Sequence, residues 1–81
     1  MFTCLDYKCQ FWRGLGNGET VNIGKVADRD MCYRKVKSTH SDANAATFKR
    51  EDNSCLAVFN ATRYNVVSND YETCVFGGKF S

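Results

Sequence analysis

Cysteine is the residue type with the clearest chemistry in this 81-residue chain, because the sequence holds five of them. They are Cys4, Cys9, Cys32, Cys55 and Cys74, and successive ones lie 5, 23, 23 and 19 residues apart. A structural zinc site needs close pairs such as C-x2-C, and no pair here has that spacing. We therefore expect disulfide bonds, and neither a metal site nor a cofactor. An odd count leaves one cysteine outside the internal disulfides.

The single histidine gives little basis for catalysis. His40 lies in a polar stretch between Ser38 and Ser41. Nucleophilic catalysis needs a histidine held by packing against its nucleophile, and neighbours on a turn rarely take that geometry. The glycine-rich segment 14–18 lacks the Lys-Ser/Thr pair of a phosphate-binding loop, and no helix is predicted directly after it. We therefore expect that the protein is not an enzyme.

Length and composition predict a single domain over residues 1–81. A chain of this size buries only about 60% of the surface that it exposes when unfolded, so it needs additional stabilisation such as disulfides. Hydrophobic residues at 43% and aromatic residues at 14% exclude a disordered chain. The apolar runs are too short to span a membrane. A net charge of +2 is small for a nucleic-acid-binding domain.

Cysteine-rich small domains are typical of oxidising compartments, so we expect a secreted or extracellular protein. The sequon Asn60-Ala61-Thr62 fits secretion and predicts a glycan on Asn60. Positive charge is concentrated between residues 25 and 50, which hold seven Lys and Arg and three Asp. That segment carries a charge of +4 and the rest of the chain −2. This uneven charge indicates either a local basic face or a helix surface exposed to solvent.

The hydrophobic pattern predicts an α+β fold, with one helix packed on a small antiparallel sheet and stapled to it by disulfides. Residues 2–13 are expected to be extended and residues 14–18 to form a turn. The helix is expected over 29–39 with Asp28 as its N-cap, and another turn at 68–70. The further expected strands, in order, cover residues 20–26, 45–49, 55–59, 64–67 and 71–76.

The predicted helix has an apolar face and a polar face. Three side chains are expected to point into the core: Met31, Cys32 and Val36. The other face is expected to be exposed to solvent and to carry Asp30, Tyr33, Arg34 and Lys37.

The same helix positions one disulfide. Cys32 points inward and Cys55 begins a hairpin strand, so a bond between them would join the helix to the sheet. Such a bond closes a loop of roughly 24 residues, worth about 3 kcal/mol of stability if loop-closure entropy dominates. Cys74 in the last strand then pairs with Cys4 or Cys9. We favour Cys9–Cys74, because Cys9 lies among aromatic residues, and expect the leftover Cys4 to link a second copy in a disulfide-bonded homodimer.

The order of cysteines and elements forms a recognisable combination. An N-terminal strand carries a cysteine, a helix carries Cys32 after a polar start, and Cys74 lies near the end of the chain. Between them the hairpin reads A-A-T-F, a polar turn, then C-L-A-V-F. This combination resembles the PAN/apple family, which includes the N-domain of hepatocyte growth factor, the apple domains of plasma prekallikrein, leech collagen-binding proteins and parasite surface lectins. The resemblance spans nearly the whole chain and rests on few residues.

One departure from that family concerns a second disulfide between helix and hairpin. Its cysteines would fall one turn after Cys32, at Val36, and just before the hairpin aromatic, near Ala45. Both positions are apolar here. An apolar pair can replace a buried disulfide without leaving an odd thiol.

The resemblance implies an extracellular, non-catalytic recognition module that binds a protein or a carbohydrate, sulfated glycans included. Guanidinium and ammonium groups bind sulfate or carboxylate, and an aromatic ring packs on a sugar. We therefore expect Tyr33, Arg34 and Lys37 on the helix to form the ligand-binding face. The expected partner is an extracellular protein or an anionic glycan, and neither a nucleic acid nor a membrane.

A second interpretation is a secreted cysteine-rich effector, such as a toxin or a protease inhibitor. The loop from Gly14 to Glu19, with Trp12 and Arg13 at its base, would then dock into a partner protein. Exposed Trp and Arg are typical hot-spot residues, although we favour a place in the core for Trp12. Binding that weakens steeply with salt and is competed by heparin would support the recognition module over the effector.

Overall fold

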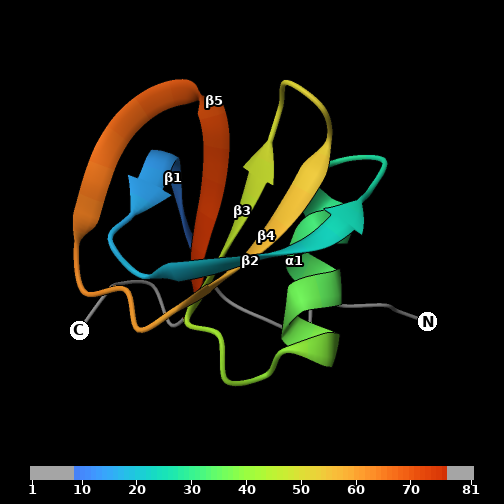
Figure 1. Cartoon of the computed structure of the whole chain (residues 1–81), viewed down its shortest axis with the longest axis horizontal. Coiled ribbons are helices and arrows are strands. Elements are labelled where there is room, and N and C mark those ends of the chain that lie inside the picture. Colours follow the sequence, from blue (N-terminus) through green and yellow to red (C-terminus); the bar gives the residue numbers. More distant parts are fainter. Residues whose placement is uncertain (1–8, 77–81) are drawn as a thin grey trace.

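The computed structural model describes residues 9–76, which form one helix and five strands (Figure 1). The elements are β1 (Cys9–Gly16), β2 (Glu19–Lys25), α1 (Arg29–Thr39), β3 (Ala45–Lys49), β4 (Ser54–Phe59) and β5 (Tyr64–Phe76). All five strands join one antiparallel sheet in the order β1-β5-β3-β4-β2, and α1 packs on β3 and β4. The expected α+β fold with one helix on an antiparallel sheet is confirmed.

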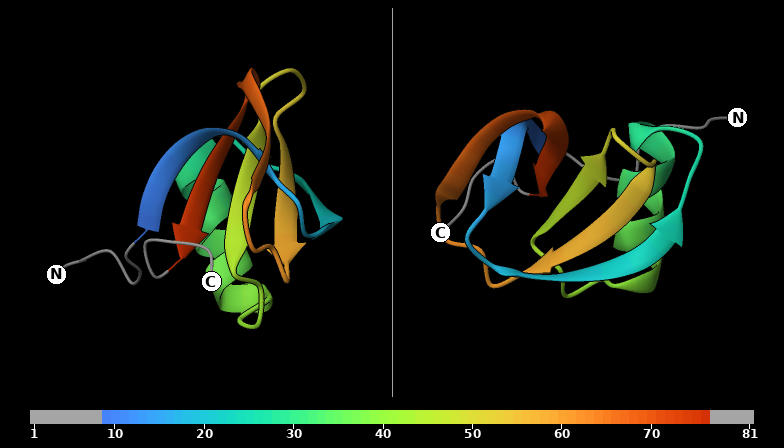
Figure 2. Two further views of the ribbon diagram at one scale, coloured as in Figure 1. Left: turned by 90° about the vertical axis from the view of Figure 1, so that its left-hand side faces the viewer. Right: turned by 45° about the horizontal axis from the view of Figure 1, so that its top comes forward.

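β1 and β2 follow each other in the chain but lie at opposite edges of the sheet. Because neighbouring strands are antiparallel throughout, these two edge strands run in the same sense. Only Asn17 and Gly18 join them, so the chain continues across one end of the sheet from edge to edge (Figure 1). The sheet curls to allow this crossing (Figure 2). The predicted turn over 14–18 is therefore too long, since residues 14–16 are part of β1.

Asn17 ties this crossing to the segment that enters β5. Its backbone N–H donates to the Arg63 carbonyl over 3.0 Å. Its side-chain Oδ1 accepts hydrogen bonds from the amides of Thr62 at 2.7 Å and Arg63 at 3.1 Å, and its Nδ2 donates to Thr62 Oγ1 over 3.1 Å. Gly18 is required here, because a Cβ at this position would overlap the Phe59 carbonyl. These contacts close the curled end of the sheet.

The predicted turn at 68–70 is wrong, because β5 is one continuous strand. Arg13 pairs with Glu72 on β5, whereas the next residue, Gly14, pairs with Val67. The β5 residues between these two pairs therefore bulge out of the ladder with β1, and pairing with β3 keeps part of them in the sheet. A Ser-Asn-Asp sequence that is typical of a turn here forms a bulge.

α1 begins and ends where the sequence predicts, and the Asp28 carboxylate accepts a 2.9 Å hydrogen bond from the Met31 amide as its N-cap. The prediction that Cys32 and Val36 face the core is confirmed, but the predicted places of Met31 and Tyr33 are wrong. Met31 is 51% exposed, whereas Tyr33 is only 5% exposed and joins Cys32 and Val36 on the buried face. Tyr33 replaces Met31 because its large ring buries more apolar surface and its hydroxyl finds a carbonyl partner on β5.

Most of the core lies between α1 and the sheet, and a smaller apolar cluster lies on the opposite face. Val36 and Ala45 are both fully buried, but Val36 belongs to the helix-side cluster and Ala45 to the opposite one. Successive strand residues point to opposite faces, so Ala46 shares the cluster of Val36 instead. The predicted apolar pair at Val36 and Ala45 is therefore not a packed pair.

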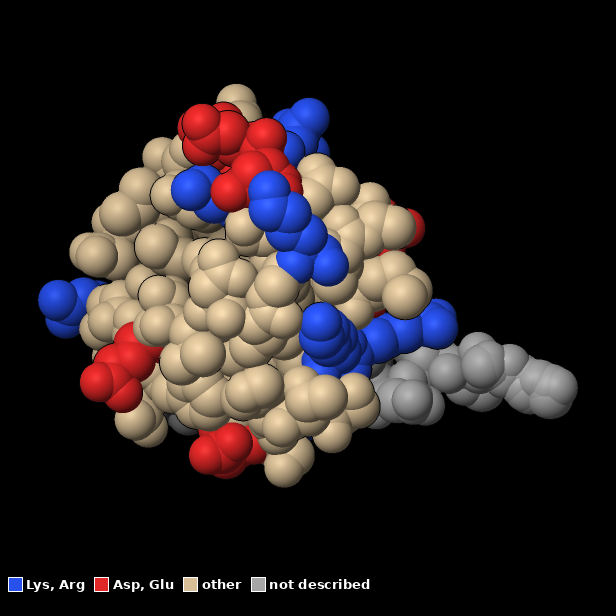
Figure 3. Space-filling view, turned by 45° about the vertical axis from the view of Figure 1, so that its right-hand side comes forward, with Lys and Arg blue, Asp and Glu red and all other residues tan. Residues whose placement is uncertain are grey.

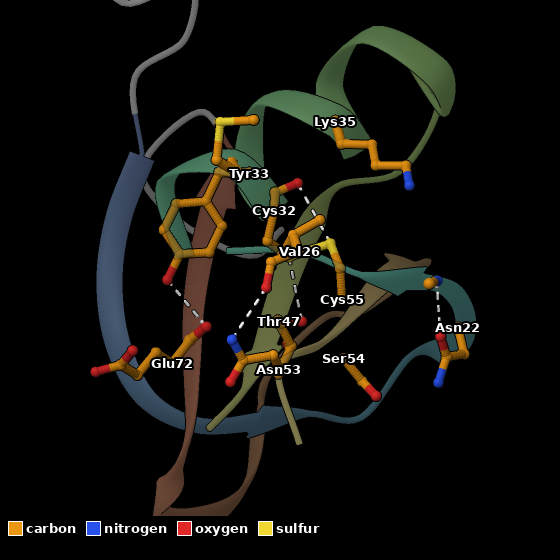
Figure 4. The surroundings of a disulfide bond; sticks show 12 residues. Asn22, Val26, Cys32, Tyr33, Lys35, Thr47, Asn53, Ser54, Cys55 and Glu72 are labelled. Carbon is orange, nitrogen blue, oxygen red and sulfur yellow. Dashed lines mark hydrogen bonds between the residues drawn. A yellow bond between two sulfur atoms is a disulfide. The ribbon is translucent and has the colours of Figure 1, made fainter. Parts of the chain in front are cut away.

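Two disulfides join segments that are distant in sequence. Cys32–Cys55 links α1 to β4 and Cys9–Cys74 links β1 to β5, each with Cα atoms 5.3 Å apart. Figure 4 shows Cys32 and Cys55 between the helix and the sheet. These are the pairings that the sequence analysis favours. Cys4, the expected intermolecular cysteine, lies outside the described residues.

Candidate functional site

An open cleft of about 500 Å³ lies beside the N-terminal end of α1. Its walls come from β1, the β2–α1 link, the first turn of α1, β3, the β3–β4 turn and β5. The residues that line it are Arg13, Ala27, Asp28, Arg29, Phe48, Arg50, Asn53 and Glu72. Three guanidinium groups and two carboxylates therefore surround one cleft, which leaves a formal charge of +1 from its lining.

Glu72 is the carboxylate that two of these arginines contact. Arg13 Nη1 lies 3.5 Å and Arg29 Nη1 lies 3.4 Å from the same oxygen, Glu72 Oε2. The Glu72 side chain is 12% exposed, whereas both arginine side chains are about half-exposed. The Tyr33 hydroxyl donates to the backbone carbonyl of Glu72 over 2.9 Å (Figure 4). The backbone of Glu72 is thus fixed while two half-exposed cations cover its carboxylate.

Phe11 orients the same two arginines. The guanidinium carbon of Arg29 lies 4.5 Å from the centre of the Phe11 ring, and that of Arg13 lies 5.3 Å from it. Both distances are within the range of cation–π attraction. Phe11 and Arg13 are two positions apart on β1, so they point to the same face of the sheet. The arginines are therefore held at the cleft by a carboxylate and by an aromatic ring.

Arg50 and Asn53 form another part of the cleft from the β3–β4 turn. Arg50 Nη1 donates to the Asn69 carbonyl over 3.4 Å, and within residues 9–76 it forms no ion pair with a carboxylate. Asn53 has φ 63°, and its Nδ2 donates to the carbonyls of Val26 at 3.1 Å and Ala27 at 3.4 Å. The turn is therefore fixed to the link before α1, and Arg50 is a cation available to a ligand.

The start of α1 adds positive potential to the cleft. The first amides of a helix carry a partial positive charge, which attracts anions. The Asp28 carboxylate partly offsets this charge and is bound to the Met31 amide.

In the β3–β4 turn, hydrogen bonds from the Ser54 hydroxyl and amide lower the pKa of Asp52 from its usual 3.8. Asp52 is therefore ionised at neutral pH, outside the cleft lining.

The helix face predicted from the sequence is not assembled as expected. Tyr33 is buried, because its ring packs in the core and its hydroxyl is bound to Glu72, so it cannot pack on a sugar. Arg34 is exposed and its Nε forms an ion pair of 3.2 Å with Asp30, one turn earlier. Lys37 is half-buried, with its Nζ 5.0 Å from the centre of the Phe76 ring. Arg34 and Lys37 therefore lie on this face without Tyr33, the aromatic residue expected to accompany them.

The other residues singled out from the sequence lie away from the cleft. His40 follows α1, with its Nδ1 2.8 Å from Thr39 Oγ1 and its ring edge-on to Phe59. Asn60, the predicted glycan site, is exposed in the link between β4 and β5. Trp12 is half-buried and stacks on Tyr64 with ring centres 3.9 Å apart. Among the described residues, no cluster of His, Cys, Asp or Glu has the size to hold a metal ion.

Most of the cleft is not indicated by the sequence. The sequence places Arg13 only at the base of a loop, and Arg29 and Arg50 only within the basic segment. Glu72 lies 59 residues from Arg13 and 43 from Arg29, and no local pattern indicates contacts over such distances. The one available signal is the alternation of Phe11 and Arg13 on β1, which places an aromatic and a cation on one face.

No protein-family model matches this chain, and no curated protein or solved structure is significantly similar to it. The resemblance to the PAN/apple family stays a prediction, which the cysteine order and the hairpin sequence support.

Proposed function

We propose that this chain is an extracellular, non-catalytic recognition module of PAN/apple type, and that the cleft beside α1 binds an anionic group of a protein or sulfated carbohydrate. The observation that carries the proposal is the meeting of Arg13, Arg29 and Arg50 at one open cleft. Arginine offers a rigid fork of N–H donors that matches carboxylate and sulfate oxygens.

The size and lining of the cleft fit a compact ligand. A volume of about 500 Å³ lies in the range of small-molecule sites, roughly 300 to 1,000 Å³. Phe48 adds an apolar surface, and the helix N-terminus adds positive potential. The excess charge of +1 in the lining is balanced by one anionic group.

The wider surface favours local recognition over a long polyanion. Figure 3 shows Lys and Arg side chains on one face in separate groups with acidic side chains among them. A net charge of +2 likewise gives only a weak overall attraction for polyanions. The anionic group that matters is therefore one that enters the cleft, and nucleic acid is not the proposed partner.

Two features support an extracellular location. One disulfide joins α1 to β4 and another joins β1 to β5, and such bonds persist in oxidising compartments. Exposure of Asn60 leaves its predicted sequon accessible for a glycan. Within the described residues, no helix is long and apolar enough to span a membrane.

A secreted effector that docks on one protein is the second candidate. The observation that favours it is Val67 on β5, a large apolar side chain that is 83% exposed. Exposed apolar surface is typical of protein contacts. The loop expected to dock is not a projecting loop, because residues 14–16 are strand and Asn17 is bonded to the β5 entry.

An array of glycans and extracellular-matrix proteins, probed with the oxidised chain at two salt concentrations, tests the proposal. We expect binding to sulfated glycans that weakens as salt rises, because exposed ion pairs are screened. Salt-insensitive binding to a single protein would support the effector instead. Absence of binding to every anionic glycan and acidic protein would contradict the proposed function.

A further inference from the structure

We propose that Glu72 occupies the place of the ligand's anionic group, and that a sulfate ester of a saccharide displaces its carboxylate from Arg13 and Arg29. This inference rests on the proposed function and adds the chemistry of the ligand and the way in which the site opens. Glu72 is then an internal competitor of the ligand. Its carboxylate shields the two arginines from anions that bind them less well than it does.

The contacts that Glu72 makes are those of a replaceable partner. Arg13 and Arg29 both approach one oxygen, Oε2, at 3.5 and 3.4 Å. Strong pairs of arginine with an anion are shorter, about 2.7 to 2.9 Å, and frequently use two parallel N–H bonds. Neither contact has that form, so each guanidinium keeps N–H donors for another anion. Exchange of these long contacts for shorter ones favours the ligand.

The backbone of Glu72 does not need to move during this exchange. Its Cα pairs with Arg13 on β1 and Phe48 on β3, and its carbonyl accepts the Tyr33 hydroxyl. Only the rotatable side-chain bonds must change for the carboxylate to leave its present position. Phe11 meanwhile holds Arg29 and Arg13 by cation–π contacts that do not involve Glu72. The two arginines therefore stay at the cleft when the carboxylate turns away.

The charges around the cleft favour one sulfate group. A sulfate ester carries one negative charge and three terminal oxygens, enough to accept from two guanidinium groups at once. Arg50, which has no carboxylate partner within residues 9–76, supplies the charge that balances the anion while Glu72 stays ionised nearby. The lining charge of +1 becomes zero when one sulfate binds.

Calorimetric titration with two defined sugars tests the inference: a sulfated heparin disaccharide, and an unsulfated hyaluronan disaccharide that carries only a carboxylate. In Glu72→Gln the competing charge is lost, and we expect the sulfated sugar to bind tighter by on the order of fivefold. The hyaluronan disaccharide should bind more weakly than the sulfated one in every variant. Equal affinity for both sugars would overturn the assignment to sulfate.

Two further variants separate displacement from a general effect of charge. Asp28→Asn removes the same charge from the same cleft and keeps an N-cap side chain, so it measures the effect of charge alone, and displacement predicts a smaller gain in affinity than in Glu72→Gln. Glu72→Asp keeps the charge but shortens the side chain, which withdraws the carboxylate from both arginines. Displacement predicts tighter binding in Glu72→Asp than in wild type. A general charge effect predicts no change in Glu72→Asp and equal gains in Glu72→Gln and Asp28→Asn.

The outcomes also distinguish this inference from the proposed function. If wild type binds the sulfated sugar, and Glu72→Gln and Glu72→Asp bind it no more tightly than wild type does, Glu72 positions the arginines and the inference is overturned. If neither wild type nor any Glu72 variant binds either sugar, while each variant melts as wild type does, the proposed glycan function itself is overturned.

Discussion

The hydroxyl of Tyr33 donates a 2.9 Å hydrogen bond to the backbone carbonyl of Glu72, 39 residues later in the chain, and so joins the buried face of α1 to β5. The bond forms because Tyr33 rather than Met31 turns toward the sheet. Arg29 in the first turn of α1 and Arg13, the partner of Glu72 on β1, then meet the same carboxylate. The orientation of one helical aromatic residue thus helps to assemble the cleft.

Removal of that hydroxyl tests the relationship. Tyr33→Phe should lower the free energy of unfolding by about 1 kcal/mol, because a part-buried hydrogen bond is lost while the ring still packs. Urea denaturation measures the change. Tyr71→Phe is the matched control on β5 and should stay within about 0.5 kcal/mol of wild type. Equal stability of both variants would show that the bond to Glu72 contributes nothing.

The Cys32–Cys55 disulfide should be a major contribution to the stability with which α1 packs on the sheet. Its cysteines are 23 residues apart and fully buried. Cys32→Ala combined with Cys55→Ala should destabilise the fold by about 3 kcal/mol, through loop-closure entropy in the unfolded chain. Thermal melting measures the loss, and peptide mapping without reduction should recover the bonded pair from wild type. Recovery of both cysteines as free thiols would contradict the structure.

At the curled end of the sheet, Asn17 should be the polar side chain whose replacement lowers the free energy of unfolding most. Asn17→Ala removes three side-chain hydrogen bonds to Thr62 and Arg63, so we expect a loss of about 1 to 3 kcal/mol in the free energy of unfolding. Asn65→Ala, at an exposed position on β5, is the control and should change stability by less than about 0.5 kcal/mol. A loss no larger than that of the control would mean that the crossing closes without Asn17.

The stability of the β3–β4 turn should depend on pH through Asp52. The pKa of Asp52 is lowered from 3.8 mainly by the Ser54 hydroxyl and then by the Ser54 amide. A depressed pKa means that the ionised form favours the folded state, so this stabilisation is present above pH 3.8 and is lost as pH falls through the folded pKa. Titration of Asp52 by NMR should show the low pKa, and Ser54→Ala should raise it. A pKa of 3.8 or higher in wild type would contradict the hydrogen bonds described.

Local signals in the sequence are sufficient for several parts of the fold. Asp28 marks the start of α1, and the hairpin of β3 and β4 has clear apolar runs around a polar turn. The Cys32–Cys55 pairing follows from one inward helix position and one strand start. Each of these features depends on a few neighbouring residues, and the sequence shows them directly.

Features that depend on distant segments could not be predicted in the same way. Tyr33 and Met31 are both apolar enough to face the core, and the choice depends on how each side chain packs and on the carbonyl of Glu72 on a distant strand. The places of β1 and β2 at opposite edges depend on the whole sheet. The cleft unites Arg13 and Arg29 with Glu72 from three elements, so no window of sequence contains it.

The helix face proposed from the sequence provides a comparison for the cleft. Arg34→Ala combined with Lys37→Ala removes two cations, of which Arg34 is already paired with Asp30. We expect a small decrease in the salt needed to elute the protein from immobilised heparin, without a change in melting temperature. A decrease larger than that of a cleft variant would return the binding site to the helix face.

Elution of Arg50→Gln from immobilised heparin, compared with elution of Arg63→Gln, tests most directly whether the cleft binds the anionic ligand. Both variants lose one exposed cation, but only Arg50 lines the cleft, and neither leaves a described carboxylate without its ion pair. Arg50→Gln should elute at clearly lower salt than wild type, while Arg63→Gln should elute close to it. Equal elution of the two variants would contradict the claim that the cleft binds the anionic ligand.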